Sequence, residues 1–455
     1  MAIQDGSGTI SSGGQRYTGF VNAGDLPDQP APIRTDGVAA WMRDNLFNGA
    51  FNSILSLAAL ALILYVMPGA LGWLIFNANW TGGAEACRAN PDGACWPFVS
   101  SRWEQFLYGF YEKSERWRID ILLGILAVGI VAMVYEKTPG RLYVAVFMLF
   151  IFPVLAFFMM YGGDLTQSKL LISALLVVGL FLSIGSRGLV KSFSTFVLVL
   201  GLALLFFRVT GLLQLTGSGS MQMLDDWLSK VVYTLPIVDT PQWGGFTLTL
   251  VIALSGIVAS LPLGVLLALG RRSEMPIISL LCTVFIEFWR GIPLVAVLFM
   301  ATIMFPLFLP ADVKFDQLLR AVIGVALFAS AYMAEVVRGG LQAIPKGQYE
   351  GAMALGLPFG KMMRLVVLPQ ALKIVIPGIV NTFIGLFKDT TLVLIIALFD
   401  LLGIVQASIA DPNWSIKSVP YTGYAFVAIV FWICCYSMAR YSRYIEDKLH
   451  TGHKR

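Results

Sequence analysis

Long uncharged apolar stretches alternate with short polar segments along most of the chain. The longest of them reach the about 20 residues that an α-helix needs to cross the hydrocarbon core of a bilayer. The pattern predicts ten spanning helices, at residues 50–76, 118–136, 141–161, 169–186, 191–212, 243–270, 276–307, 317–338, 372–397 and 422–444. We therefore expect an all-α, polytopic membrane protein.

The segment before the first span has a different pattern. Residues 1–37 are rich in Gly, Pro, Ser and Asp and low in hydrophobicity, which predicts disorder. They do not begin with a basic region followed by an apolar run, so we do not interpret them as a cleavable signal peptide. Residues 38–47 predict a short helix lying in the membrane interface, with an apolar side made of Val38, Trp41, Met42 and Leu46.

Composition restricts the class of protein. Of the 455 residues, 57% are hydrophobic and only 13% are charged, whereas soluble domains carry about 25% charged residues. So little charge cannot cover a water-facing surface, which excludes a soluble enzyme. The net charge of +5 is modest, and Lys and Arg lie in short segments between apolar stretches. That distribution is typical of membrane orientation and not of nucleic-acid binding.

The short loops predict the orientation of the chain. If the N-terminus is cytoplasmic and the spans alternate, both termini and the basic loops fall inside, as the positive-inside rule requires; these loops contain Lys137, Arg141, Arg187, Lys191, Arg271 and Arg272. The long loop 78–117 then lies outside. Cys87 and Cys95 bracket a polar turn in that loop, where they form either a disulfide, which an oxidising compartment permits, or two free thiols.

Residues for catalysis or nucleotide binding are scarce. The only histidines, His450 and His453, lie in the polar C-terminal tail, which we interpret as a frayed end and not as a metal site. The run Gly356–Met362 has the wrong spacing for a G-x-x-x-x-G-K-[ST] phosphate loop and lacks its hydroxyl. We expect no ATP site, metal or cofactor in this chain. A membrane-embedded enzyme would need histidine clusters or paired carboxylates, whereas Glu287 and Glu335 are single carboxylates.

The largest inner loop, residues 339–370, predicts two short helices joined by a turn. Residues 347–355 suit a helix, Gly356 can end it in a left-handed conformation, and Pro358 can open a second helix. The loop could simply connect two spans. Its small residues, among them Gly351 and Ala352, would instead let the surface of another protein approach closely.

This loop resembles the EAA loop of ABC-importer permeases. Glu350-Gly-Ala-Met-Ala-Leu-Gly356, nine further residues and then Val366-Val-Leu368-Pro369 keep the spacing of that motif, with Gly351 and Val366 as the departures. Four neighbouring runs resemble the polar amino-acid branch of the family: 287–294, 331–340, 347–348 and 387–392. The likeness covers about residues 240–445. The preceding helices and the loop 93–96 resemble the larger permease subunit of general L-amino-acid importers of the glutamate/glutamine/aspartate/asparagine type.

The resemblance implies a set of partners in a bacterial inner membrane. They are a second permease subunit in a heterodimer, two copies of an ATPase that bind ATP and Mg, a periplasmic amino-acid binding protein and membrane lipid. The resemblance also divides the chain into four parts: residues 1–47, a five-helix extension 48–239, a permease core 240–445 and a tail 446–455. The residues expected to couple the chain to the ATPase are Gln348, Glu350, Gly351, Ala352, Gly356, Leu368 and Pro369.

Charged residues inside spans are costly and usually face a cavity or a partner. Glu287 and Arg290 are three residues apart, so they share a helix face and can neutralise each other. Gly291 and Pro293 follow and predict a kink. The four residues could hold the ammonium and carboxylate groups of a zwitterion, or form a structural ion pair. The substrate pathway is expected to include Glu287, Arg290, Gly291, Pro293, Tyr332, Glu335, Lys388, Asp389 and Thr390.

Two of these expectations have alternatives. Glu335 and Arg338 repeat the three-residue spacing near the inner end of their span, which favours a pair that anchors the loop. The whole chain could also be an ion-coupled secondary amino-acid transporter. That class would show inverted repeats with two matching broken helices, and the sequence has one clear Gly-Pro break, at 291–293.

Overall fold

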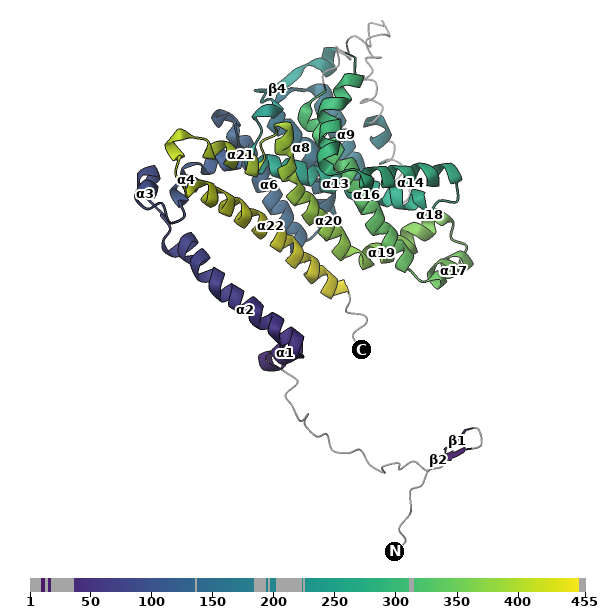
Figure 1. The fold of residues 1–455 in the computed structure, drawn as a ribbon. Helices are drawn as coiled ribbons and strands as arrows, with labels where there is room; N and C mark the ends of the chain where they lie inside the picture. The colour runs from purple at the N-terminus through teal and green to yellow at the C-terminus, as the bar shows by residue number, and fades with distance from the viewer. Residues whose placement is uncertain are drawn as a thin grey trace. The chain divides into compact units, whose positions relative to one another are not determined.

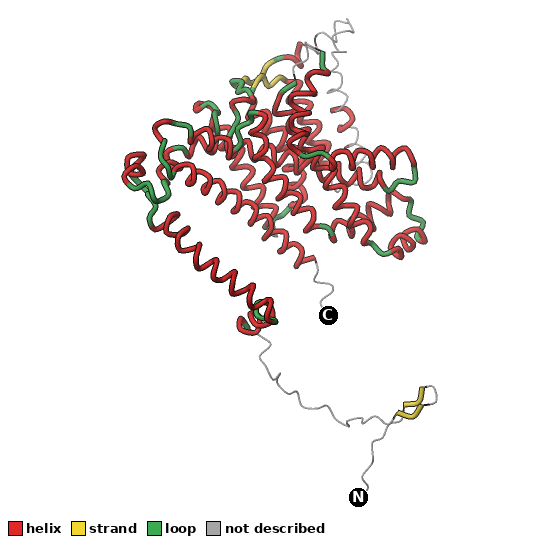
Figure 2. The backbone as a smooth tube through the Cα atoms, viewed as in Figure 1, coloured by secondary structure: helices red, strands yellow, loops and turns green. Residues whose placement is uncertain are grey.

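The computed structural model is mostly helical and divides into two units, residues 1–76 and 77–455. It describes residues 10–12, 15–17, 37–135, 137–183, 194, 197–201, 223, 226–310 and 315–449. Figure 2 shows that helices make up most of this backbone. The predictions for His450, His453 and most of residues 1–37 lie outside the described residues.

The first unit contains a two-stranded antiparallel ribbon and two helices. Its elements are β1 (Ile10–Ser12), β2 (Gln15–Tyr17), α1 (Val38–Asn45), α2 (Ala50–Leu71) and the π-helical turn η1 (Gly72–Phe76). The predicted interfacial helix lies at α1. The predicted first span is α2 with η1, and none of its residues is buried.

The second unit begins with short helices, followed by an antiparallel pair of strands that the sequence pattern did not predict. The elements are α3 (Gly83–Ala89), α4 (Trp96–Ser101), α5 (Trp103–Tyr108), η2 (Lys113–Glu115), α6 (Arg116–Val134), α7 (Arg141–Val146), η3 (Phe147–Ile151), α8 (Phe152–Tyr161), β3 (Gly163–Thr166), α9 (Gln167–Ser183) and β4 (Val231–Leu235).

The remaining helices form the core of this unit (Figure 1). They are η4 (Thr240–Gln242), α13 (Gly245–Arg271), α14 (Pro276–Gly291), α15 (Leu294–Phe299), η5 (Met300–Met304), η6 (Phe305–Phe308), α16 (Gln317–Ala343), α17 (Lys346–Ala354), α18 (Phe359–Met362), η7 (Met363–Val367), α19 (Leu368–Ile374), α20 (Ile376–Asp389), η8 (Thr390–Ile396), α21 (Leu401–Ile409), η9 (Pro412–Trp414) and α22 (Val419–Leu449).

Among the described residues, six helices are long and apolar enough to span a membrane, and two bent pairs bring the number to eight. The membrane-spanning helices are therefore present, but the predicted number of ten is not confirmed. The span predicted at 169–186 contains α9, in which the stretch Gln167–Gly179 is counted among the shorter apolar helices of the described residues, and residues 184–186 lie outside them. The span predicted at 191–212 lies mostly outside the described residues.

Close packing of α13 against α16 positions the part of the core that lies next to α17, α18 and α19. A Cβ atom at Gly264 would lie 2.6 Å from Met333 Cγ, so only glycine permits this approach. In the same way, a Cβ at Gly340 would lie 2.7 Å from the carbonyl oxygen of Ala371, which brings α19 against α16. One buried apolar cluster joins these helices to α17 and α18. The short helices after α16 are thus fixed to the ends of long ones.

Candidate functional site

Helices α17 and α18 form an elbow after α16 (Figure 1). The Gly356 N–H donates to the Met353 carbonyl at 2.9 Å and the Leu357 N–H to the Ala352 carbonyl at 3.2 Å, which together form a Schellman motif. Gly356 has a φ of +68°, the left-handed conformation that glycine adopts without strain. The predicted stop at Gly356 is therefore found, and Pro358 directly precedes α18.

The base of α17 is attached to the core by side chains. Tyr349 Oη donates to the Leu341 carbonyl of α16 at 3.1 Å, and Gln370 Nε2 of α19 donates to Gln348 Oε1 at 3.0 Å. Ala352 is buried beneath the elbow. The elbow is thus a fixed projection and not a loose connection.

The outer surface of the elbow is not covered by any other described part of the chain. Glu350, Gly351 and Pro369 are exposed, and Leu368 is half-buried. Three large apolar side chains project here with exposed fractions of 57%, 81% and 58%: Met353, Leu355 and Phe359. An exposed apolar group of this kind is typical of a protein-binding surface.

Five charged residues meet where α13, α14 and α16 end beside the elbow; we call them the charge network. Arg271 Nη2 lies 2.8 Å from Glu287 Oε1, and Arg271 Nη1 lies 3.5 Å from Glu335 Oε2. Arg290 Nη1 lies 3.5 Å from the same Glu335 oxygen. Arg338 contacts both carboxylate oxygens of Glu335, with Nε 3.0 Å from Oε2. The network therefore holds three guanidinium groups and two carboxylates.

The network corrects one predicted pairing. Glu287 and Arg290 share a helix, but Glu287 pairs with Arg271 of α13 and Arg290 with Glu335 of α16. Neighbouring helices supply the partners because their ends converge here, which the spacing within one helix cannot reveal. The pair predicted between Glu335 and Arg338 is present.

The predicted kink lies directly after the network. The axis turns by 105° between α14 and the helix that starts at Leu294, with Gly291 and Pro293 at the break. Arg290 lies over the ring of Tyr332, with Cζ 5.8 Å from the ring centroid. The Arg290 Nε atom is buried and has no hydrogen-bond partner among the described residues. The break thus presents an incompletely used guanidinium.

The residues Lys388, Asp389 and Thr390 lie where α20 changes into the 3₁₀-helix η8. Lys388 is exposed, Asp389 is half-buried, and buried Thr390 donates its hydroxyl to the Phe387 carbonyl at 2.8 Å. Within the described residues, no hydrogen bond or ion pair joins these three to the charge network. A long 3₁₀ stretch at this place is typical of a hinge.

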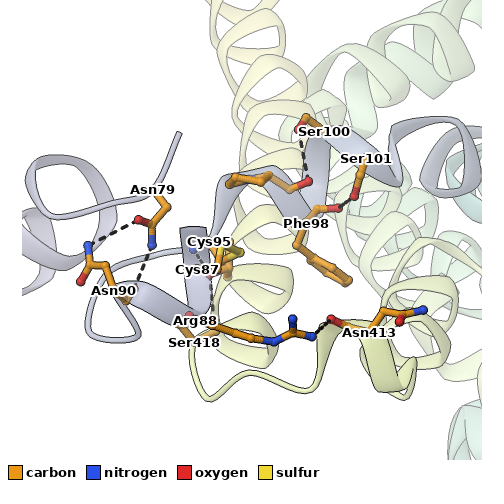
Figure 3. The surroundings of a disulfide bond; sticks show 12 residues. Asn79, Cys87, Arg88, Asn90, Cys95, Phe98, Ser100, Ser101, Asn413 and Ser418 are labelled. Carbon is orange, nitrogen blue, oxygen red and sulfur yellow. Dashed lines mark hydrogen bonds between the residues drawn. A yellow bond between two sulfur atoms is a disulfide. The ribbon is translucent and has the colours of Figure 1, made fainter. Parts of the chain in front are cut away.

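A disulfide joins Cys87 to Cys95 with a Cα–Cα distance of 5.6 Å (Figure 3), in an apolar cluster shared with Phe246 and Ala253 near the start of α13, the end opposite to the elbow. Both cysteines are fully buried, and the Cys95 N–H donates to Thr422 Oγ1 of α22 at 2.8 Å. Arg88 Nη2 donates to the Asn413 carbonyl at 2.8 Å, as Figure 3 shows. This loop is therefore attached to the core at several points.

Arg271, Arg272 and Tyr349 were missing from the predicted site. From the sequence, the two arginines are assigned only to membrane orientation. A signal was available, since Tyr349 directly precedes Glu350 and the arginines end the apolar run of α13. Among the described residues, no group of three or more His, Cys, Asp or Glu side chains could hold a metal ion.

Comparison with known proteins identifies the family. Residues 260–451 match the family described as "Binding-protein-dependent transport system inner membrane component". The chain is 42% identical to the "Inner membrane amino-acid ABC transporter permease protein YhdY" of Escherichia coli, over 94% of this chain and 97% of the relative. This chain belongs to the amino-acid ABC transporter permeases. As a permease of this family, it is a multi-pass protein of the inner membrane.

Two further permeases match different shares of this chain. The "Glutamate/glutamine/aspartate/asparagine transport system permease protein BztC" of Rhodobacter capsulatus is 39% identical, over 96% of this permease and 99% of the relative. The "Probable glutamine ABC transporter permease protein GlnP" of Bacillus subtilis is 32% identical, over 45% of this permease and 91% of the relative. GlnP thus matches only part of this chain, whereas BztC matches nearly all of it.

Proposed function

We propose that this permease moves polar or general L-amino acids inward as one half of a heterodimer with a second permease. Two ATPase copies bind ATP and Mg, and a periplasmic binding protein delivers the substrate. The substrate class follows the name of BztC and the runs at 287–294 and 387–392. In this assignment the chain binds no nucleotide itself.

The observation that carries the proposal is the elbow. Its base is attached to α16 and α19, its EAA-like residues Glu350 and Gly351 face outward, and its apolar tip at Leu355 is exposed. We assign this surface to a groove on the ATPase. A rigid helix is required there, because a flexible loop would absorb a displacement instead of passing it to the spans.

The orientation follows from the same assignment. The elbow and the charge network lie on the cytoplasmic side, with both termini. The disulfide between Cys87 and Cys95 lies on the periplasmic side, where an oxidising compartment preserves it. Membrane lipid surrounds the spans.

The proposed mechanism is alternating access. The break at Gly291–Pro293 and the 3₁₀ stretch after Asp389 are the places where helices can bend. The unused Nε donor of Arg290 and the half-exposed carboxylate of Glu287 suit the carboxylate and ammonium of an amino acid.

The charge reversal Glu350→Lys tests the function. The purified complex in proteoliposomes is expected to lose ATP-dependent amino-acid uptake while the permease remains inserted in the membrane. Asp447→Lys, which reverses an exposed carboxylate near the end of α22, is the matched control and is expected to retain uptake.

Two results would contradict the proposal. One is normal ATP-dependent uptake by Glu350→Lys. The other is uptake by the unaltered permease in vesicles that hold an ion gradient but no ATP, which would favour the ion-coupled secondary transporter.

A further inference from the structure

Two consecutive arginines at the end of α13 contact different helices. Arg272 Nη1 donates to Tyr349 Oη of α17 at 3.2 Å, and its guanidinium lies over the tyrosine ring with Cζ 5.8 Å from the centroid. Arg271 contacts Glu287 of α14 and Glu335 of α16. A single peptide unit therefore separates a contact with the elbow from a contact with α14, the first half of the span that breaks at Gly291–Pro293. We call this span, residues 276–308, the broken span.

We propose that Arg271 and Arg272 transmit the movement of the elbow to the broken span. They are positioning residues, acting through Tyr349 on one side and Glu287 on the other. The inference rests on the proposed function, because the elbow can transmit movement only if an ATPase displaces it.

Hydrogen bonds hold the turn that contains these arginines to both α13 and α14. The Arg272 N–H donates to the Leu269 carbonyl at 3.1 Å, which continues the helical bonding past the end of α13. Ser279 Oγ of α14 donates to the Arg271 carbonyl at 2.9 Å. A displacement of Arg272 is thus passed to α14 through the backbone of the turn and through the side chain of Arg271.

Three contacts fix the position of the Tyr349 side chain relative to Arg272. Its hydroxyl accepts a hydrogen bond from Arg272 and donates one to Leu341, and its ring faces the guanidinium. Tilting α17 therefore moves Arg272 with it. No other side-chain hydrogen bond or ion pair joins α17 to α13 within the described part of the chain.

The charge network offers Glu335 more than one partner. Glu335 faces three guanidinium groups, so it stays paired when Arg271 moves away. Arg271 and Glu335 side chains are 22% and 25% exposed, so water can replace a lost contact. Coupling between two sites requires such an element with two accessible states.

A double-mutant cycle on the complete complex tests the inference. Arg272→Gln, Tyr349→Phe and the double variant are reconstituted with the ATPase and the binding protein. The measurements are ATP hydrolysed per amino acid imported and the amount of ATPase that copurifies. Arg443→Gln, at an exposed arginine near the end of α22, is the matched control.

Arg272→Gln is expected to retain the ATPase and basal hydrolysis while raising the ATP used per amino acid about fivefold or more. Tyr349→Phe keeps the ring and is expected to have a smaller effect. The double variant is expected to raise the ratio by less than the sum of the two single effects, because both changes remove the hydrogen bond between Arg272 and Tyr349, although Tyr349→Phe also removes the bond to Leu341. Arg443→Gln is expected to keep the ratio of the unaltered complex.

Several results would overturn the inference. An unchanged ratio in Arg272→Gln, or additive effects in the double variant, would show that the arginine does not act through Tyr349. Loss of the ATPase from Arg272→Gln would make the residue part of the docking surface, and the proposed function would stand. If Arg272→Gln does not fold, Tyr349→Phe alone decides by whether its ratio rises. Failure of the unaltered permease to bind an ATPase would overturn the proposed function as well.

Discussion

The two ends of α13 are held to their neighbours in different ways. At the disulfide end, a covalent bond, the buried hydrogen bond from Cys95 N–H to Thr422 Oγ1 and the partly buried one from Thr247 Oγ1 to the Leu107 carbonyl fix the loop to the core. At the elbow end, ion pairs around Glu335 whose side chains are 22–33% exposed make the connections.

The difference separates a fixed end from an adjustable one. Buried hydrogen bonds and a disulfide have no competing partner, so rearranging them leaves polar groups unsatisfied. Partly exposed ion pairs contribute less net stability, because water reaches them and they can exchange partners with water or with one another. We infer that the disulfide end stays rigid while the helix ends at the elbow move. The predictions that follow test this contrast, from the largest expected effect to the smallest.

The largest effect is expected at Gly109, where two backbone segments touch. Gly109 has a φ of +66°, and a Cβ there would lie 2.3 Å from Gly244 Cα. Gly109→Ala is expected to lower the free energy of unfolding by about 3 kcal/mol or more, because strain and overlap add. Gly83→Ala is the matched control, since Gly83 has a φ of +71° but open space around it. Equal thermal unfolding of both variants in detergent would contradict the rigid contact.

The next effect concerns a buried carboxyl at the same end. Asp400 is fully buried and accepts the Gly403 N–H at 2.9 Å, while Oδ2 has no partner among the described residues. Burial raises the pKa of Asp400 to about 6 from an ordinary value of 3.8. A carboxyl whose pKa is raised in the folded protein lowers the free energy of unfolding once it is ionised. This loss is absent below about pH 4, grows as the pH rises, and is complete above about pH 6.

Asp400→Asn removes this cost and keeps an oxygen to accept the Gly403 N–H. The variant is expected to gain about 3 kcal/mol over the unaltered permease above pH 6, and less as the pH falls toward 4. Thermal unfolding at a series of pH values measures the difference. A difference that does not vary with pH would show that the carboxyl is not titrating in this range.

The disulfide is expected to contribute somewhat less. Cys87→Ser with Cys95→Ser is expected to cost about 2–3 kcal/mol, because the bridge closes a short loop with a sequence separation of 8. Cys434→Ser, at a free half-buried cysteine, is the control. Below its unfolding temperature the double variant is expected to use the same ATP per amino acid as the unaltered complex. A changed ratio would show that the disulfide end also takes part in coupling.

The smallest effect on stability is expected in the charge network. Arg338→Gln removes one of three guanidinium groups around Glu335 and is expected to cost about 1 kcal/mol or less. Raising NaCl from 0.1 to 1 M is expected to reduce that cost, because salt screens exposed charges. Thermal unfolding at the two salt concentrations measures it. A cost above about 3 kcal/mol would mean that the network is a buried structural cluster.

Features set by local sequence were predictable from the sequence. The run of apolar residues sets the span at Gly245–Arg271, and Gly356 and Pro358 set the elbow through their backbone preferences. The bend at Gly291–Pro293 follows from proline chemistry in the same way. Each of these depends on residues close together in the chain.

Features made by distant residues were not predictable. The three-residue spacing of Glu287 and Arg290 showed a shared helix face, but the partners come from α13 and α16. The pairing of β3 with β4 joins residues 163–166 to residues 231–235 and has no local signal. Helix α21 was missed because its nine residues are too short for a span pattern.

Photo-crosslinking tests the central claim, that the elbow binds a separate ATPase, most directly. A photoreactive residue replaces Leu355 at the exposed tip of the elbow, and in a second variant it replaces Trp103 at the disulfide end. In the purified complex, the account predicts a covalent adduct between the Leu355 position and the ATPase, and none from the Trp103 position. Absence of the adduct at Leu355, or an equal adduct at Trp103, would contradict it.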